Sequence, residues 1–325
     1  MQDQKKLILH IGLPKTGTTT IQKKWLAQFE NQLNPLSNDP EKRALKKQMG
    51  NMFRNHFPSD WANENGRATL DALWTMVAAN GGHFVYSHEG LSYPWYFQPP
   101  KQPHFLGVQP SEFPVASHIK SLVQETPYPC AVEVIVTVRS QAEWLASLYA
   151  QHSHLMKKPS QNDFEERTRA ILADPSTKGS GFIDYDALLA SLSEVVGPDA
   201  VHILFLEEMN TPAYWEKLGQ ITGLPVDTAS MSNPETGLEN VRSVAQAQWR
   251  LRPDERFKKT KIYQKSRGVR LVKRVIDAGY SRLISTDRGT IEMTRTLEQA
   301  IKSRFSDSNK RLSQRLGRSL PPNYL

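Results

Sequence analysis

The sequence predicts an α/β protein with one central parallel β-sheet that is covered by helices on both faces. Short apolar runs rich in β-branched residues alternate with amphipathic stretches, which is the pattern of strand–helix–strand units. The chain has 325 residues, of which 38% are hydrophobic, so it can bury a large core. We expect one domain, with an α/β core over residues 1–234 and a basic, helical C-terminal part of the same domain over residues 235–325.

Composition limits the cellular setting. Cys130 is the single cysteine, so no internal disulfide can form and nothing indicates an oxidising compartment. No stretch approaches the ~20 apolar residues of a membrane span. Lys5 and Lys6 precede a short apolar run. The apolar core of a signal peptide has ~7–15 residues, and this run is shorter. These features predict a soluble, cytoplasmic protein.

The first predicted strand, loop and helix form a candidate anion site. Residues 7–11 are a short apolar run broken by His10, and residues 12–17 (Gly-Leu-Pro-Lys-Thr-Gly) form a turn with two glycines. From Thr18 the period becomes helical, with Ile21, Trp25 and Phe29 on one face. Unpaired N–H groups and the helix dipole at this N-terminus, together with Lys15, predict a phosphate cradle.

The next part of the chain brings a second strand. Residues 31–67 are polar and contain scattered prolines, and we expect short helices and loops there. A helix follows over residues 70–77, and then a strand over 84–87 that leads directly into His88 and Glu89. Residues 92–114, rich in proline and aromatics, are expected to form a long loop beside the site, whose aromatic rings could stack on sugars or pack on the core.

A third strand is predicted over residues 132–138, and it ends at Arg139. Ser140 and Glu143 have the spacing of a capping box, which predicts that the following helix starts here. Ser147 lies about two turns into that helix.

The remaining elements follow the same alternation up to Pro234. We expect a polar connection over residues 157–181, a helix over 185–196 and a strand over 201–206. No strand is expected beyond Pro234. The chain should close with a long helix over residues 291–316 that Gly317 caps.

The order of residues in the loop distinguishes between phosphate donors. In the nucleoside-triphosphate loop the lysine follows the second glycine, whereas Lys15 precedes Gly17. The run G-x-P-K-T-G-T-T resembles the 5′-phosphosulfate loop of sulfotransferases, which use 3′-phosphoadenosine 5′-phosphosulfate (PAPS) as donor. The resemblance implies a sulfotransferase fold similar to that of P-loop NTPases, PAPS as co-substrate and no required metal. It also implies that the 5′ end of the donor is held by Lys15, Thr16, Gly17, Thr18 and Thr19.

Arg139 and Ser147 have the spacing and the strand-to-helix context of the residues that hold the donor's 3′-phosphate in that family. The family also uses a histidine or glutamate near a strand end as the general base. His88 and Glu89 both occupy such a place, and we favour Glu89 because Ser87 and Glu89 resemble an S-x-E segment of bacterial sulfotransferases. Lys15 suits the charge that develops on the leaving oxygen.

One part of the family pattern is absent. The glycine-rich R-K-G-x-x-G-x-W-K segment of the cytosolic small-molecule sulfotransferases does not occur, so the sequence does not identify the residues that complete the adenine and 3′-phosphate contacts. The resemblance to carbohydrate and bacterial members implies a hydroxyl-bearing glycan or glycoconjugate as acceptor. Between Arg250 and Arg274 there are eleven lysines or arginines against two acidic residues. This basic segment could bind an anionic acceptor, contact a membrane surface peripherally, or simply be a solvated helix face. No recognition motif for nucleic acid accompanies it.

Two other functions fit parts of the sequence. A phosphate-loop kinase would use Glu207, at the end of an apolar strand, as a magnesium-binding acid. A non-catalytic protein that binds PAPS or a polyanion would keep the cradle without a working base.

Overall fold

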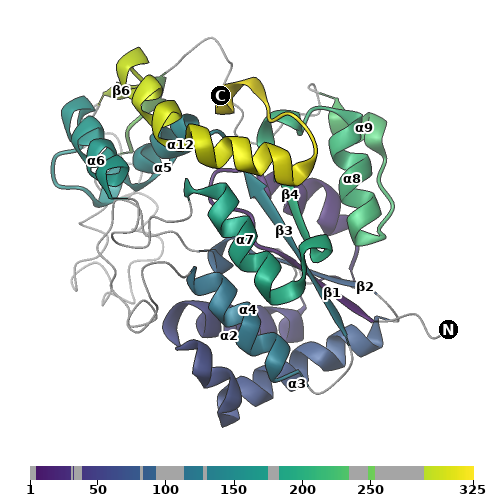
Figure 1. Ribbon diagram of the computed structural model, residues 1–325. Helices are drawn as coiled ribbons and strands as arrows, with labels where there is room; N and C mark the ends of the chain where they lie inside the picture. Colours follow the sequence, from purple (N-terminus) through teal and green to yellow (C-terminus); the bar gives the residue numbers. More distant parts are fainter. Residues whose placement is uncertain are drawn as a thin grey trace, which may run out of the picture.

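The computed structural model contains a four-stranded parallel sheet with helices on both faces, which confirms the predicted α/β fold class (Figure 1). The structure describes residues 5–30, 32, 39–80, 83–92, 113–126, 130–174, 183–233, 248–252 and 289–325. The strands are ordered β2-β1-β3-β4 across the sheet, and every neighbouring pair is parallel. Their bounds are Lys6–His10 for β1, His83–Ser87 for β2, Ala131–Val138 for β3 and Val201–Phe205 for β4.

This strand order determines where a ligand can bind. The chain leaves β1 toward β2 on one side and later returns to β3 on the other side, so the carboxyl ends of β1 and β3 lie at a switch in topology. The loop after β1 continues the ladder, because the N–H of Ile11 donates to Ile135 O at 2.9 Å and that of Leu13 to Thr137 O at 3.1 Å. In open α/β sheets such a switch point forms the ligand-binding crevice.

Two apolar layers hold the sheet. On one face Leu7 and Leu9 belong to a buried cluster with the helices that cross in front of the sheet in Figure 1 and with the C-terminal helix. On the other face Ile8 packs with Ile21 and Trp25 and with the helix after β4. The alternation of the two faces along β1 is the period-2 pattern of a strand buried on both sides. The helices of the first layer include α2 (Pro40–Asn55), α3 (Glu64–Ala79), α4 (Pro114–Gln124), α5 (Gln141–His152), α7 (Tyr185–Val196) and α12 (Arg295–Leu316), and the second layer has α8 (Pro212–Thr222), which is followed by α9 (Thr228–Ser232).

Two segments, one expected to form short helices and loops and the other a polar connection, contain longer, well-capped helices. The expectation of short helices over residues 31–67 is wrong, because α2 runs for 16 residues, with its N-terminus capped by the Asp39 side chain and Pro40 in its first turn. The polar connection after residue 157 likewise contains α6 (Gln161–Ala173), where Ser160 caps the N-terminus by accepting from Asp163 N–H at 3.2 Å. In both helices only a narrow stripe of residues is buried, and the other positions are mostly polar, so the helical period is weak in the sequence.

The expectation that no strand follows Pro234 is also wrong. The antiparallel pair β5 (Gln248–Arg250) and β6 (Thr290–Glu292) brings Trp249 opposite Ile291, and both side chains are buried. Strands of three residues carry too short an alternation to be recognised in the sequence. The closing helix therefore starts at Arg295 rather than at residue 291, and Gly317 ends it in the left-handed conformation, as predicted.

The helix after the β1 loop is irregular. Only Thr18–Thr20 (α1) is α-helical; a π-helical turn follows over Ile21–Trp25 (η1), and a 3₁₀ turn over Leu26–Gln28 (η2). Trp25 and Leu26 are both buried, so the widened turn presents two adjacent bulky residues to the same layer.

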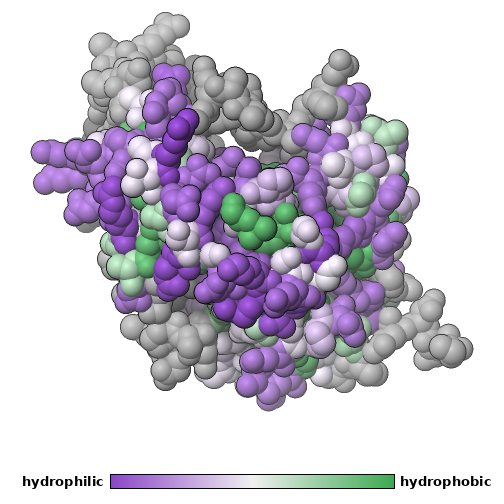
Figure 2. Space-filling view, turned by 45° about the horizontal axis from the view of Figure 1, so that its top comes forward, coloured by the Kyte–Doolittle hydropathy of each residue, from purple (hydrophilic) through white to green (hydrophobic). Residues whose placement is uncertain are grey.

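Hydrophilic residues cover most of the molecular face in Figure 2, and hydrophobic residues appear there in small separate areas. In the part of the chain that the structure describes, no helix combines the length and the hydropathy needed to cross a bilayer. The aromatic loop at residues 93–97 and residues 253–274 of the basic segment lie outside the described residues.

Candidate active site

The β1 loop has a backbone that its sequence makes possible. Gly17 precedes α1 with φ +82°, and a Cβ there would lie 2.5 Å from Met209 Cε, so this position needs glycine both for its conformation and for its space. Lys15 has φ +69° and is the one non-glycine residue with positive φ among the described residues. The left-handed conformation costs an ordinary residue about 1–2 kcal/mol. The loop thus holds Lys15 in a conformation that the chain would not adopt by itself.

The start of the helix provides donors at the same place. The N–H groups of Thr20 and Ile21 donate to Gly17 O at 2.9 and 3.3 Å, so those of Thr18 and Thr19 precede the first intrahelical bond. The hydroxyl of Thr16 donates to Leu13 O within the loop.

Thr18 has a buried hydroxyl that makes no hydrogen bond to any described residue. A Cβ on Gly12 would lie 2.9 Å from this Oγ1 atom. A buried unpaired hydroxyl costs about 1–3 kcal/mol, and an oxygen-rich ligand would satisfy it. The β1 loop therefore fits a phosphate or sulfate group through backbone N–H groups, a hydroxyl and the Lys15 charge.

A hydrogen bond joins the two segments that resemble the donor-binding motifs. The indole Nε1 of Trp144, in α5, donates to Pro14 O in the β1 loop at 2.7 Å, and Trp144 is fully buried. Trp144 is not among the site residues that the sequence predicted. The sequence does place a tryptophan on the apolar face of the predicted helix, and a buried indole N–H usually needs a hydrogen-bond acceptor nearby. The bond places the helix that follows Arg139 directly against the loop that carries Lys15.

The predicted capping box at the start of α5 is wrong, although the helix does start there. Ser140 makes no side-chain cap, and its Oγ is buried without a partner among the described residues. Glu143 instead pairs with Arg139, accepting from Nε at 2.9 Å and from a terminal guanidinium nitrogen. The N–H of Ser140 donates to Glu207 Oε1 at 2.8 Å, and the Tyr324 hydroxyl donates to the other oxygen of Glu207 at 3.3 Å. Burial raises the pKa of Glu207.

Ser147 is buried on α5, in the same strand-to-helix unit as Arg139. The first turn of this helix is attached to the C-terminal part of the chain: Gln141 donates to Asn309 Oδ1 at 2.9 Å, and Asn309 donates to Tyr324 O at 2.7 Å. The C-terminal helix therefore supports the orientation of the segment that carries Arg139 and Ser147.

A buried polar network lies beneath the loop. His10 Nδ1 lies 2.8 Å from Ser87 Oγ, and its Nε2 lies 2.9 Å from Thr137 Oγ1. Gln22 Nε2 donates to the same Ser87 hydroxyl at 3.1 Å. Burial lowers the pKa of His10 to about 4, so the ring is neutral and bonds through one donor and one acceptor. The network connects the ends of β1, β2 and β3 to the helix that follows the loop.

His88 is also held in a neutral form. The backbone N–H of His88 donates to His10 O at 3.0 Å, and the ring Nδ1 accepts from Gly90 N–H at 2.8 Å. Burial, and to a smaller extent the charges of Arg54 and Lys46, lower the pKa of His88 to about 4. The proton of the neutral ring is therefore on Nε2, and the lone pair of Nδ1 is already occupied.

Glu89 follows β2, and the Lys15 charge acts on the pKa of its carboxyl group. The residue is exposed, yet enough protein surrounds its carboxyl group for desolvation to raise its pKa, while Lys15 acts in the opposite direction. The structure thus brings Glu89 and Lys15 into electrostatic contact, and places Arg139 on the other side of the same loop. Within the described residues, no group of three or more His, Cys, Asp or Glu side chains could hold a metal ion.

The fold is that of an α/β protein, and its candidate anion site lies at the carboxyl ends of the parallel strands. No protein-family model and no curated protein matches the chain. Among solved structures, the crystal structure of a sulfotransferase from Alicyclobacillus acidocaldarius is similar to this chain over 96% of each chain, at 13% sequence identity and a TM-score of 0.47.

Proposed function

We propose that this protein is a sulfotransferase that moves a sulfuryl group from PAPS to a hydroxyl of a carbohydrate or glycoconjugate. The observation that carries the proposal is the bond from Trp144 to Pro14 O, because it joins the Lys15 loop to the helix after Arg139 at the topological switch point. Two motifs that resemble the two ends of a PAPS site therefore adjoin one another.

The donor would be held at both of its phosphates. The N–H groups of Thr18 and Thr19, the unpartnered hydroxyl of Thr18 and the Lys15 ammonium suit the 5′-phosphosulfate. Arg139 suits the 3′-phosphate, because a guanidinium has five N–H donors, of which two go to Glu143. Glu143 would keep the guanidinium oriented in the absence of donor, and Ser147 is assigned to the same phosphate by the spacing of the motif alone.

The chemistry is a displacement at sulfur. The acceptor oxygen forms a new S–O bond while the bond from sulfur to the bridging phosphate oxygen breaks, and the leaving group is adenosine 3′,5′-bisphosphate. Glu89 takes the proton of the attacking hydroxyl, and Lys15 stabilises the charge on the leaving oxygen.

Three observations support Glu89 over His88 as the base. Desolvation raises the pKa of Glu89, its carboxyl group lies within reach of the Lys15 charge, and the residue is exposed. His88 has one nitrogen protonated and the other engaged by Gly90 N–H, so it would have to break that bond to accept a proton at Nδ1.

The kinase alternative depends on Glu207 as a magnesium ligand. Both of its carboxylate oxygens accept hydrogen bonds from protein groups, which supports a structural role at the start of α5. Magnesium prefers carboxylates that are available to complete an octahedral shell.

The function is tested by donor binding and by transfer. Adenosine 3′,5′-bisphosphate and AMP are titrated calorimetrically into wild type and Arg139→Gln, with Arg167→Gln as control, because Arg167 forms an exposed ion pair on α6. We expect the bisphosphate to bind ~10–150-fold more tightly than AMP to wild type, as charge-assisted bonds of ~1.5–3 kcal/mol imply, and the difference to disappear only in Arg139→Gln.

Transfer from ³⁵S-labelled PAPS onto a glycan panel, with and without EDTA, completes the test. Equal binding of AMP and the bisphosphate would refute the Arg139 assignment. Tight donor binding without transfer to any hydroxyl would favour the non-catalytic alternative, and transfer abolished by EDTA would contradict the metal-free mechanism.

A further inference from the structure

The arginine that we assign to the 3′-phosphate of the donor is paired with a carboxylate from the first turn of α5. Arg139 Nε donates to Glu143 Oε2 at 2.9 Å, and a terminal nitrogen of the guanidinium donates to the same oxygen. Both side chains remain partly accessible to solvent, with exposed fractions of 22% for Arg139 and 39% for Glu143. A ligand that reaches Arg139 therefore meets a carboxylate at the same place.

The main chain at Arg139 is fixed independently of this pair. The hydroxyl of the buried Tyr185 donates to Arg139 O at 2.7 Å, and the N–H of the same peptide group, that of Ser140, donates to Glu207 Oε1 at 2.8 Å. A substitution of Glu143 therefore leaves the end of β3 in place. The position of the guanidinium is set by the Arg139 rotamer and by its bonds to Glu143.

A second carboxyl group belongs to the same cluster. Glu207 is held at Ser140 N–H, and the charges of Glu143 and Arg139 act on its pKa in opposite directions. When both carboxyl groups are ionised, negative charges outnumber the one guanidinium in this cluster. A phosphate dianion bound to Arg139 is therefore repelled as well as attracted.

Glu143 keeps a favourable position when another anion engages Arg139. It is the acidic residue of the first turn of α5, and the first intrahelical bond runs from Trp144 N–H, one residue later, to Ser140 O at 2.8 Å. A carboxylate near the N-terminus of a helix is stabilised by the helix dipole. The Glu143 carboxylate therefore stays beside the site while a phosphate is bound there.

The 3′-phosphate is present both on PAPS and on the bisphosphate that leaves after transfer. Interactions with this group therefore stabilise donor and product alike and do not favour the transition state. In many enzymes product release limits turnover, and a site that bound the 3′-phosphate at full strength would retain the product. A carboxylate beside Arg139 weakens the binding of both.

We propose that Glu143 limits the affinity of the Arg139 site for the 3′-phosphate, so that the bisphosphate product is released and fresh donor enters. Glu143 sets the affinity of the donor site and takes no part in the transfer of the sulfuryl group itself. The inference rests on the proposed function for the identity of the ligand.

The test titrates adenosine 3′,5′-bisphosphate and AMP calorimetrically into wild type and Glu143→Gln. The variant keeps the size of the side chain and an oxygen acceptor for Arg139, but it removes the charge. We expect the bisphosphate to bind about three- to tenfold more tightly to the variant, as the loss of one solvent-screened repulsion implies. AMP, which lacks the 3′-phosphate, should bind both proteins alike, whereas a general structural change would affect both ligands together.

A second substitution separates charge from shape. Glu143→Asp keeps the negative charge, so it should bind the bisphosphate like wild type. In the transfer assay, the concentration of bisphosphate that inhibits Glu143→Gln should be lower than that for wild type by the same factor as the change in affinity. Thermal unfolding verifies that each variant is folded.

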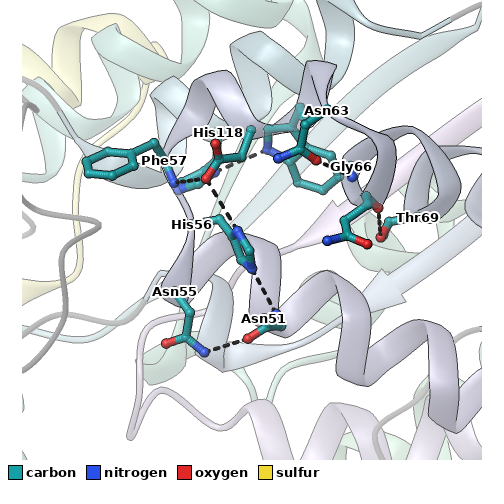
Figure 3. A network of polar contacts seen from close by, with 11 residues as sticks. Asn51, Asn55, His56, Phe57, Asn63, Gly66, Thr69 and His118 are labelled. Carbon is teal, nitrogen blue, oxygen red and sulfur yellow. Dashed lines mark hydrogen bonds and ion pairs between the residues drawn. The ribbon is translucent and has the colours of Figure 1, made fainter.

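Two carboxylates from other ion pairs serve as controls. Glu165→Gln removes the charge that accepts from Arg169, at 2.7 Å on α6. Asp60→Asn removes the charge beside His56, whose Nδ1 lies 3.3 Å from Asp60 just after α2; Figure 3 shows His56 and its neighbours. Both pairs belong to other elements than Arg139, so neither variant should change the preference for bisphosphate over AMP.

The proposal is overturned if Glu143→Gln binds the bisphosphate no more tightly than wild type, if AMP gains as much, or if Glu143→Asp gains as much as Glu143→Gln. A preference for bisphosphate that is unchanged in Glu143→Gln, in a protein that transfers from PAPS, leaves the proposed function standing and removes this inference. A preference that increases in Glu143→Gln, in a protein that transfers nothing, does the reverse. If neither protein binds the bisphosphate, both are refuted.

Discussion

The substitution Gly17→Ala tests how the β1 loop is built. It places a side chain on a residue with φ +82°, at a cost of about 1–2 kcal/mol for the left-handed conformation. The new Cβ would also lie 2.5 Å from Met209 Cε and 2.8 Å from Leu206 Cδ1. Met209 is fully buried, so its side chain moves only by repacking the layer beneath α8, and overpacking of this kind costs about 1–3 kcal/mol more. The total is about 2–5 kcal/mol.

Gly317→Ala is the matched control. Gly317 has φ +62° at the C-terminus of α12, and nothing lies within 4 Å of a Cβ there, so only the conformational cost of about 1–2 kcal/mol applies. Denaturant unfolding should therefore show a larger loss for Gly17→Ala than for Gly317→Ala, and Met209→Ala should be coupled to Gly17→Ala by ~0.5–3 kcal/mol in a double-mutant cycle. Bisphosphate binding should weaken in Gly17→Ala alone. Equal losses of stability together with zero coupling to Met209 would refute the packing argument.

Four further predictions concern the site. Lys15→Ala should lower kcat far more than it weakens bisphosphate binding, because the charge on the leaving oxygen develops in the transition state; steady-state kinetics that show a raised KM at unchanged kcat would contradict this. Glu89→Gln should bind donor normally and lose about 10²–10⁴-fold in kcat, and wild-type activity should fall as pH decreases through the raised pKa of Glu89; an unaltered kcat would exclude it as the base. His88 has a pKa of about 4 when folded and 6.5 as its ordinary value, so its contribution to stability is present above pH 6.5 and is lost as pH falls toward 4; His88→Asn should recover up to about 2 kcal/mol of the stability that wild type loses between pH 7 and pH 5, measured by urea unfolding at both pH values. Ser140→Ala should change stability by less than about 0.5 kcal/mol, because its hydroxyl caps nothing, whereas Glu207→Ala should cost about 1–3 kcal/mol by leaving Ser140 N–H unpaired; the same unfolding assay would show the reverse order if the capping box formed in solution.

The features that the sequence predicted correctly depend on neighbours within one strand or one turn. The runs that became β1 and β3 are apolar and rich in β-branched residues, and such runs form buried strands in many environments. Their parallel pairing followed from the helices between them. Gly317 was identified as a helix end because a left-handed C-cap is a local requirement. The common location of Lys15, Glu89 and Arg139 followed from one rule, that parallel strands end at the same edge.

The predictions that were wrong depend on contacts with distant parts of the chain or on weak sequence patterns. Ser140 and Glu143 have the correct spacing for a capping box, but Arg139 offers Glu143 a stronger, charged partner, and Glu207 offers Ser140 N–H an acceptor. Short helices and loops were expected where α2 runs for 16 residues, because its apolar stripe is narrow and most of its other positions are charged or polar.

The sequence by itself determined the four strands of the parallel sheet, the glycine-and-lysine loop after β1 and the charge that this loop offers to an anion. Only the tertiary structure decided which residues complete the site: Trp144 reaches Pro14 across 130 residues, and Glu207 reaches Ser140 across 67. The physical reason is that propensity and periodicity act over a few residues, whereas these contacts depend on the order β2-β1-β3-β4 and on the layer that each helix covers. That order is chosen by the sum of many weak apolar contacts across the whole core, so no single segment encodes it.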